Sequence, residues 1–169
     1  MGHSEHREKA PASLRVAVLS VSTTRTTLDQ DASGQRIAAQ ASGHGHQVVD
    51  HRLASDDVDA IRRAVTGMMA DSAPQAVIVT GGTGISPRDV TIEALRPLMG
   101  KELTAFGPIF AQLSHQDIGP AALISRATAG VIGRTLVFCL PGSLKACQLA
   151  CNALIFPELG HLQVHLSEG

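Results

Sequence analysis

The sequence predicts an α/β protein in which a mostly parallel sheet is sandwiched between helices. The chain has 169 residues, which is the length of about one domain. Short apolar runs alternate with segments of helical spacing along almost the whole chain, as in βαβ units. The apolar runs are continuous, which is typical of strands that are buried on both faces. We therefore expect a single domain over residues 14–169.

The N-terminal half alternates strands with helices. We expect strands at 14–21, 47–53 and 75–80, and helices at 33–42 and 57–70. In the second of these helices, Ile61, Val65 and Met68 have helical spacing and share one face. That face is expected to cover the sheet.

The C-terminal half completes the sheet after a glycine turn at 81–84. Ser86 and Pro87 are typical of a helix start, with serine as the N-cap and proline at the first helical position. We expect helices at 87–97 and 106–115, strands at 121–126 and 135–140, and a final amphipathic helix that carries Leu144, Cys147, Cys151, Leu154 and Ile155.

The composition excludes several classes of function. A formal charge of -1 and the lack of Trp and Tyr argue against nucleic-acid binding, because phosphates need a basic surface and bases stack on aromatic rings. No apolar run approaches about 20 residues, so no membrane span is expected. Cysteines without zinc spacing fit a reducing cytosol, and we expect a cytoplasmic protein. The polar residues 1–13 are expected to form a flexible tail.

The most informative segment follows the strand at 75–80. Gly81, Gly82 and Gly84 let the backbone turn tightly and point several N–H groups at one spot, which suits a phosphate. The loop matches neither a Walker A motif nor the dinucleotide G-x-G-x-x-G spacing. The alternative is a tight turn between a strand and a helix that binds nothing.

Three aspartates near this edge of the sheet have a structural interpretation beside a functional one. Asp31 or Ser33, and Asp56, fit helix N-caps, and Asp89 fits the first turn of a helix. Asp89 also stands at the mouth of the glycine loop, where a carboxylate suits a magnesium ion held against nucleotide phosphates.

Two more loops are expected at the same edge, because the carboxyl ends of parallel strands meet there. Arg25, after the first strand, is a candidate phosphate clamp. After the last strand, the turn at 141–142 leads to Ser143 as a helix N-cap. Lys145 in the first helical turn opposes the helix dipole, which points to an anionic partner.

The eight histidines do not cluster at metal-ligand spacing, and we expect them on the surface. His161 and His165 have the helical spacing of a metal-binding pair, but the sequence shows no third ligand for them.

Taken together, TGGTGISPRDVT (80–91), SRATAG (125–130) and LPGS (140–143) resemble the molybdopterin-binding family of molybdenum cofactor biosynthesis, of the small MoaB and MogA type. The resemblance extends from Val16 to Leu166, and DIGPAA and PELGHL are more similar to the MoaB branch. It implies a three-layer α/β/α domain that assembles as a trimer or hexamer and works with other proteins of this biosynthesis. It also implies Mg²⁺-dependent adenylylation of molybdopterin by ATP, with release of diphosphate.

The resemblance also implies roles for individual residues. The implied catalytic residues are Asp31, Asp56 and Asp89, of which Asp56 and Asp89 also hold the metal. The implied phosphate-binding residues are Gly81, Gly82, Thr83, Gly84, Pro141, Gly142 and Ser143. The implied molybdopterin-binding residues are Ser22, Arg25, Ser125 and Arg126.

Two positions depart from the family pattern and keep a rival function open. Thr23 stands where the family commonly has aspartate, and Leu144 stands where it often has proline. The rival is a carrier that holds molybdopterin or a nucleotide without turnover. The retained carboxylates favour the enzyme, because a carrier has less need of them. A third interpretation, a related domain of the competence-damage family acting on another nucleotide, is disfavoured by a resemblance that runs the length of the chain.

Overall fold

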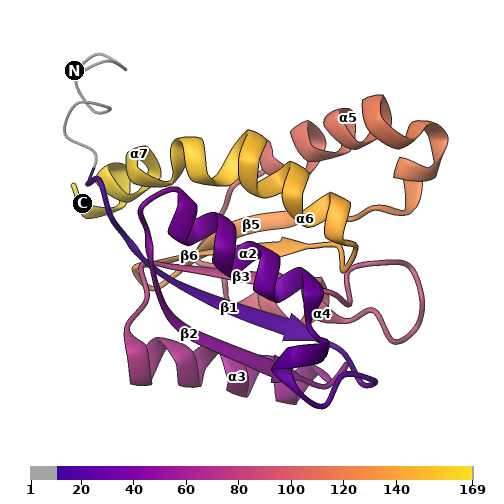
Figure 1. Cartoon of the computed structure of the whole chain (residues 1–169), viewed down its shortest axis with the longest axis horizontal. Coiled ribbons are helices and arrows are strands. Elements are labelled where there is room, and N and C mark those ends of the chain that lie inside the picture. Colours follow the sequence, from indigo (N-terminus) through magenta and orange to yellow (C-terminus); the bar gives the residue numbers. More distant parts are fainter. Residues whose placement is uncertain (1–10, 169) are drawn as a thin grey trace.

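The computed structural model describes residues 11–168 and contains a six-stranded sheet in the order β2-β1-β3-β6-β5-β4 (Figure 1). The strands are β1 (Arg15–Val21), β2 (Gln47–Ala54), β3 (Ala76–Thr80), β4 (Lys101–Glu102), β5 (Thr128–Ile132) and β6 (Thr135–Leu140). β1, β2, β3 and β6 are parallel, whereas β5 and β4 are antiparallel to their neighbours. The expected mostly parallel sheet is confirmed. The tail expected at 1–13 lies outside the described residues up to position 10.

Helices cover both faces of the sheet (Figure 1). Those on one face are α2 (Ala32–Gly43), α5 (Phe106–Ile118), α6 (Leu144–Ala150) and α7 (Phe156–Ser167); those on the other are α3 (Val58–Ser72) and α4 (Thr91–Leu95). The short turns are η1 (Leu28–Gln30), η2 (Arg96–Leu98), η3 (Gly119–Ile124) and the π-helical η4 (Cys151–Ile155). None of the described helices has the length and apolar composition needed to span a membrane.

Alternate residues of the central strands belong to two separate cores. Val16 and Val18 of β1 pack with α2 and α7, whereas Ala17 and Leu19 of the same strand pack with α3 and α4. Because successive side chains of a strand point to opposite faces, a strand buried on both sides must be apolar throughout. The architecture is therefore a three-layer α/β/α sandwich, as expected.

The helix expected at 57–70 forms as α3, but its N-cap is not Asp56. Ile61, Val65 and Met68 of α3 are fully buried against the sheet. The N-cap is Asp57, whose Oδ1 accepts a hydrogen bond from the Ala60 N–H at 2.8 Å. The helix begins one residue later than predicted, which leaves the Asp56 carboxylate turned toward the loop after β1.

The expected helix at 87–97 is wrong in its first part, because α4 begins only at Thr91. Ser86 caps no helix. Its N–H donates to Asp89 Oδ2 at 2.8 Å and its carbonyl accepts from the Asp89 N–H at 2.9 Å, which closes a separate turn. Thr91 is bonded back to the glycines through its N–H and hydroxyl, so the residues between them form a loop.

The expected strand at 121–126 is also wrong, since this segment forms the turn η3 and the strand β5 begins at Thr128. Leu123 and Ile124 are 88% and 57% exposed, so their apolar character does not reflect a place in the sheet. In β5, a Cβ at Gly130 would stand 2.6 Å from the Lys101 carbonyl oxygen. The close approach of β4 requires glycine there, at the expense of the apolar pattern that marks a strand.

Candidate functional site

The loops after β1, β3 and β6 surround one cavity of about 460 Å³ at the carboxyl edge of the parallel strands. This is the edge at which α/β sheets bind ligands. The cavity is lined by Val21, Ser22, Arg25, Gly81, Gly82, Thr83, Gly84, Asp89, Ile124, Ser125, Pro141, Gly142 and Ser143. Most of the candidate residues are thus brought together. Three of them, Asp31, Asp56 and Arg126, lie behind this lining.

The glycine loop has a backbone that only glycine adopts readily. Gly81 and Gly82 have φ values of +96° and +64°. A Cβ at Gly81 would stand 2.3 Å from the Val21 carbonyl oxygen, and one at Gly82 would stand 2.5 Å from Thr91 Oγ1. Both positions therefore need glycine for the turn itself, before any ligand is considered.

The carbonyl groups of this loop accept hydrogen bonds from Thr91 and Arg126. The Thr91 hydroxyl donates to the Gly81 carbonyl at 2.8 Å, and the Thr91 N–H donates to the Gly82 carbonyl at 2.9 Å. Arg126 Nε donates to the carbonyls of Thr83 and Gly84, at 2.8 and 3.0 Å. In a trans peptide the N–H points opposite to the carbonyl. Fixing these carbonyls therefore turns the N–H groups that follow them away from Thr91 and Arg126.

Most N–H groups of the glycine loop have no acceptor in the part of the chain that the structure describes. Those of Gly82, Thr83 and Gly84 donate to no other residue within 11–168, and only that of Gly81 is engaged, by the Leu140 carbonyl. The Thr83 hydroxyl is buried and also has no partner in this part of the chain. A buried hydroxyl without a partner is rare, because it costs free energy. The loop is therefore a concave cluster of donors suited to an anion.

Arg126, which was expected on the molybdopterin side of the site, holds the glycine loop in place. Its two Nη atoms lie 2.6 and 3.3 Å from the carboxylate oxygens of Glu93 in α4. The pair raises the pKa of Arg126 and, through the same hydrogen bonds, lowers the pKa of Glu93. Each of the three guanidinium nitrogens of Arg126 therefore donates at least one hydrogen bond to the loop or to Glu93. Nothing in the sequence pattern marks Glu93, which is 33 positions away from its partner.

Arg25 is the cationic side chain of the cavity lining, and it contacts the buried carboxylate of Asp31. Arg25 Nη1 lies 3.5 Å from Asp31 Oδ1. Asp31 is fully buried, and it also accepts from the Gly34 N–H at 3.0 Å as the N-cap of α2. Its other oxygen, Oδ2, lies 2.9 Å from His51 Nε2. Asp31 therefore caps a helix as expected, and it contacts the cavity only through Arg25.

The surroundings of Asp31 keep it ionised. Burial alone raises the pKa of Asp31, but the Ser20 hydroxyl, the Gly34 N–H and His51 together outweigh burial and lower this pKa. His51 lies in β2 and was not a candidate on sequence grounds, because a single histidine in a strand carries no pattern.

Asp56 and Asp89 stand on either side of the glycine loop. Asp56 Oδ2 accepts a hydrogen bond from the Thr23 N–H at 2.7 Å and another from the Thr23 hydroxyl. A Cβ at Gly82 would lie 3.4 Å from Asp56 Oδ1, and one at Gly84 would lie 2.7 Å from Asp89 Oδ2. Within residues 11–168, neither carboxylate forms an ion pair. Both keep capacity to bind a cation beside an anion in the loop.

The turn after β6 completes the cavity. Ser143 Oγ accepts from the Ala146 N–H at 3.2 Å and so caps α6, as the sequence predicts. The Ser33 hydroxyl donates to the Gly142 carbonyl at 2.9 Å, and the Thr80 hydroxyl donates to the Pro141 carbonyl at 3.0 Å. These bonds from α2 and β3 hold the turn against the glycine loop.

Comparison with known proteins matches residues 17–161 to the family described as "Probable molybdopterin binding domain". Molybdenum cofactor biosynthesis protein B of Bacillus subtilis is 47% identical over 163 residues, which cover 96% of this chain and 95% of that protein. A crystal structure of molybdenum cofactor biosynthesis protein B has 42% identity and a TM-score of 0.90, covering 95% of this chain and 99% of that one. The tungsten cofactor synthesizing protein MoaB of Pyrococcus furiosus has 34% identity and a TM-score of 0.84, with coverages of 93% and 99%.

Proposed function

We propose that this chain, which belongs to the molybdopterin-binding domain family, acts in molybdenum cofactor biosynthesis as a Mg²⁺-ATP-dependent molybdopterin adenylyltransferase. The observation that carries the proposal is the row of N–H groups at Gly82, Thr83 and Gly84, which have no acceptor within residues 11–168, beside the carboxylates Asp56 and Asp89, which form no ion pair in the same part of the chain. Donors and carboxylates side by side suit a phosphate that arrives with a divalent cation. The names of the relatives support the biosynthetic role.

In the proposed reaction, a phosphate oxygen of molybdopterin forms a bond to the α-phosphorus of ATP, while the bond from that phosphorus to diphosphate breaks. The products are adenylyl-molybdopterin and diphosphate. Such transfers depend mainly on positioning and charge neutralisation. We assign the phosphate oxygens to the loop N–H groups and the Thr83 hydroxyl, and the second anionic group to Arg25 and to the serines Ser22 and Ser125 of the lining.

Asp56 and Asp89 fit a magnesium ion, because magnesium is usually bound by one or two carboxylates together with phosphate oxygens and water. When bound, the ion would neutralise charge on the reacting phosphates. Thr23 donates two hydrogen bonds to Asp56 Oδ2 and so fixes its orientation with Oδ1 toward Gly82. The hydroxyl thus has a positioning role at the place where the family commonly has a carboxylate.

A carrier that binds molybdopterin or a nucleotide without turnover is the second candidate. It is favoured by the position of Asp31, because this carboxylate is committed to Gly34, His51 and Arg25 and does not line the cavity. Fewer carboxylates are then left to act directly on a bound substrate.

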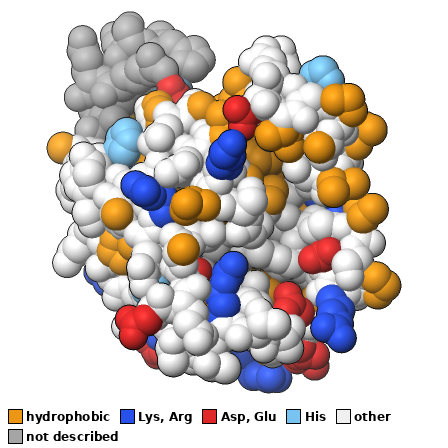
Figure 2. All heavy atoms as spheres, turned by 45° about the vertical axis from the view of Figure 1, so that its right-hand side comes forward, with side chains coloured by type: hydrophobic (Ala, Val, Ile, Leu, Met, Phe, Trp, Pro, Cys, Tyr) orange, Lys and Arg blue, Asp and Glu red, His pale blue; other side chains and the backbone are white. Residues whose placement is uncertain are grey.

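We also propose a trimer or hexamer, a cytoplasmic location and further proteins of molybdenum cofactor biosynthesis as partners. Support for self-association comes from α5 and η3, where Ile109, Ile118, Leu123 and Ile124 are between 44% and 88% exposed. Figure 2 shows hydrophobic side chains gathered at the upper right of that view. Apolar surface of this kind is commonly buried between subunits. Light scattering that gives a monomer would contradict the oligomer.

The proposed reaction is tested by incubating the full chain with molybdopterin, ATP and Mg²⁺ and measuring adenylyl-molybdopterin and diphosphate. Asp89→Asn should retain the acceptor for the Ser86 N–H and the fold, but lower turnover by orders of magnitude. Asp71→Asn, an exposed position at the far end of α3, is the matched control and should leave turnover unchanged. Binding of molybdopterin without product would favour the carrier, and absence of both binding and product would refute both functions.

A further inference from the structure

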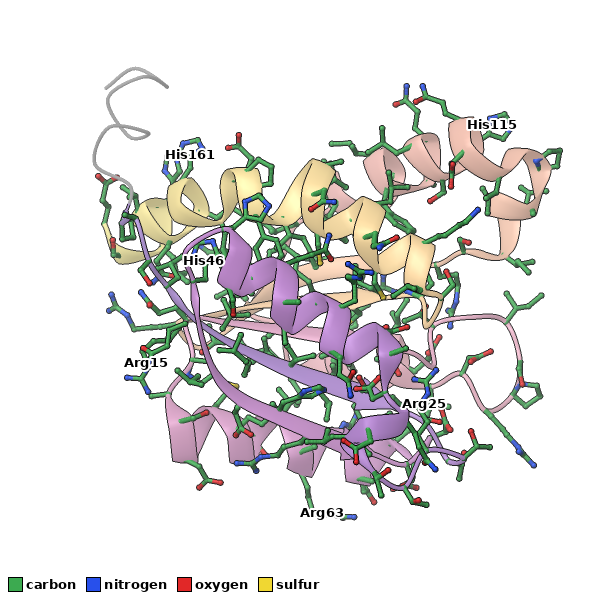
Figure 3. The ribbon with its side chains drawn as sticks, in the orientation of Figure 1. Arg15, Arg25, His46, Arg63, His115 and His161 are labelled. Atoms are coloured by element: carbon green, nitrogen blue, oxygen red, sulfur yellow. The ribbon has the colours of Figure 1, made fainter. Side chains whose placement is uncertain are left out.

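A second cluster of chemically active side chains lies on α7, far from the cavity described above. Figure 3 shows His161 and His46 at one end of the molecule and Arg25 at the other. Glu158, His161 and His165 follow one another at spacings of three and four residues, so they share one face of α7. His161 is buried, with 8% of its surface exposed, whereas His165 is exposed to solvent.

The two imidazoles face each other through the same type of nitrogen. The Nε2 atoms of His161 and His165 are 3.0 Å apart, and the ring centroids are 4.7 Å apart at an angle of 55°. With metal–nitrogen bonds of about 2.0–2.1 Å, two adjacent ligands at a right angle stand about 2.9 Å apart, and two ligands of a tetrahedron stand about 3.3 Å apart. The observed separation therefore fits neighbouring positions of a square-planar or octahedral ion.

Glu158 provides the outer contact that metal-binding histidines usually have. Its Oε2 lies 3.0 Å from His161 Nδ1, which makes Nδ1 the donor to the carboxylate and leaves Nε2 as the lone-pair nitrogen. The contact also fixes the plane of a ring that is already buried. One ligand is thus pre-oriented, and His165 lies one turn further along the same face of α7.

Space for further ligands is present beside the pair. A cavity of about 500 Å³ borders Glu158 and His161. The other histidines of its lining are engaged elsewhere: His44 and His46 stack on Phe156 at 5.1 and 5.5 Å, and His46 Nδ1 accepts the Leu14 N–H. No group of three or more His, Cys, Asp or Glu side chains in residues 11–168 is placed to hold a metal ion. The described residues thus supply two nitrogen ligands, and water can fill other positions of the ion.

We propose that His161 and His165 form a two-histidine site for a divalent ion that prefers imidazole and tetragonal or octahedral geometry, Ni²⁺ or Cu²⁺, with Glu158 behind His161. The ion takes the place of the proton between the two Nε2 atoms, and His165 then carries its single ring proton on Nδ1. The site is independent of the proposed adenylyl transfer.

The test is thermal unfolding of the full chain at pH 7.5 with increasing Ni²⁺. Binding to the folded chain raises Tm, and the helical spacing of the pair is lost on unfolding. We expect wild type to gain Tm with Ni²⁺, His165→Asn to lose this gain, and the control His115→Asn, at an exposed position of α5, to keep it.

Calorimetric titration with Ni²⁺ gives a second readout, with an expected loss of at least tenfold in affinity for His165→Asn. His161→Gln serves as a second variant, and it should show the same loss of the Ni²⁺-dependent gain in Tm. A Tm of wild type that does not respond to excess Ni²⁺ or Cu²⁺ would overturn the proposal. An equal gain in wild type and His165→Asn would overturn it as well, since the ion would then bind elsewhere.

Discussion

Replacing Thr83 with valine removes one hydroxyl from the cavity wall and keeps the branched shape of the side chain. Thr83 is 2% exposed, and its Oγ1 has no hydrogen-bond partner among residues 11–168. Leaving a buried polar group unsatisfied costs about 1–3 kcal/mol. Without ligand, Thr83→Val should therefore leave the free energy of unfolding unchanged or raise it, by at most about 3 kcal/mol.

The same substitution should weaken binding. A hydrogen bond to a charged group contributes about 1.5–3 kcal/mol, and each 1.4 kcal/mol corresponds to a tenfold change in affinity. If the Thr83 hydroxyl donates to a bound phosphate, Thr83→Val should lower the affinity for that ligand roughly ten- to hundredfold. The variant thus separates stability from binding, because the two are expected to change in opposite directions.

Urea unfolding and calorimetric titration with Mg²⁺-ATP and with molybdopterin measure the two effects. Thr91→Val is the control, since it makes the same chemical change at a buried hydroxyl that does have a partner, the Gly81 carbonyl at 2.8 Å. It should lower the free energy of unfolding by about 1–3 kcal/mol. If Thr83→Val destabilised the fold as much as Thr91→Val and left both affinities unchanged, the hydroxyl would have a partner inside the protein and the anion site would be refuted.

Two further predictions concern the backbone and the buried carboxylate. Gly82→Ala should destabilise the fold by about 1–2 kcal/mol or more, because φ is +64° and the new Cβ would meet Thr91. The control Gly43→Ala should be neutral or stabilise α2 by up to about 1 kcal/mol, because no atom lies within 4 Å of the new Cβ. Equal urea midpoints of the two variants would contradict this prediction. Asp31→Asn keeps the N-cap but removes the charge beside Arg25. Since the folded state holds the pKa of Asp31 below 3.8, the ionised carboxylate stabilises the fold above about pH 4, and this contribution is lost as the pH falls through the lowered pKa. The variant should therefore be less stable than wild type at pH 7 by about 1–3 kcal/mol, and this difference should shrink as the pH falls through the lowered pKa; a difference that does not change with pH would contradict the assignment.

The central strands could be predicted because their burial on both faces forces an uninterrupted apolar run. β5 could not, because its place in the sheet depends on the size of Gly130 and on the approach of Lys101 rather than on hydrophobicity. The segment 121–126 has more apolar residues than β5 but leaves Leu123 and Ile124 exposed. The same apolar residue types occur on an exposed turn and in a buried strand, so the sequence does not distinguish the two.

The candidate site also contains features that the sequence predicts and features that it does not. The glycines and the turn at 141–143 could be placed at one edge, since strand ends converge there whatever their side chains do. The partners that orient the site could not be placed, because Glu93 and His51 reach Arg126 and Asp31 from other elements and have no local pattern. The error at Ser86 arose because a serine–proline–aspartate pattern also closes an isolated turn.

The location of Asp31 changes which variants can decide between an enzyme and a carrier. Asp31 acts on the cavity through Arg25 and also stabilises α2, so a loss of activity in Asp31→Asn would follow equally from weaker binding and from a weaker fold. Asp89 lines the cavity, and Asp56 lies next to Gly82 with one oxygen uncommitted to Thr23. Substitution of either carboxylate by its amide removes charge beside a bound phosphate with little change in shape. A carrier would keep or gain affinity for its anionic ligand, because the repulsion from the carboxylate is lost. An enzyme that needs Mg²⁺ would lose turnover. Affinity and turnover measured for variants at these two positions therefore separate the two functions.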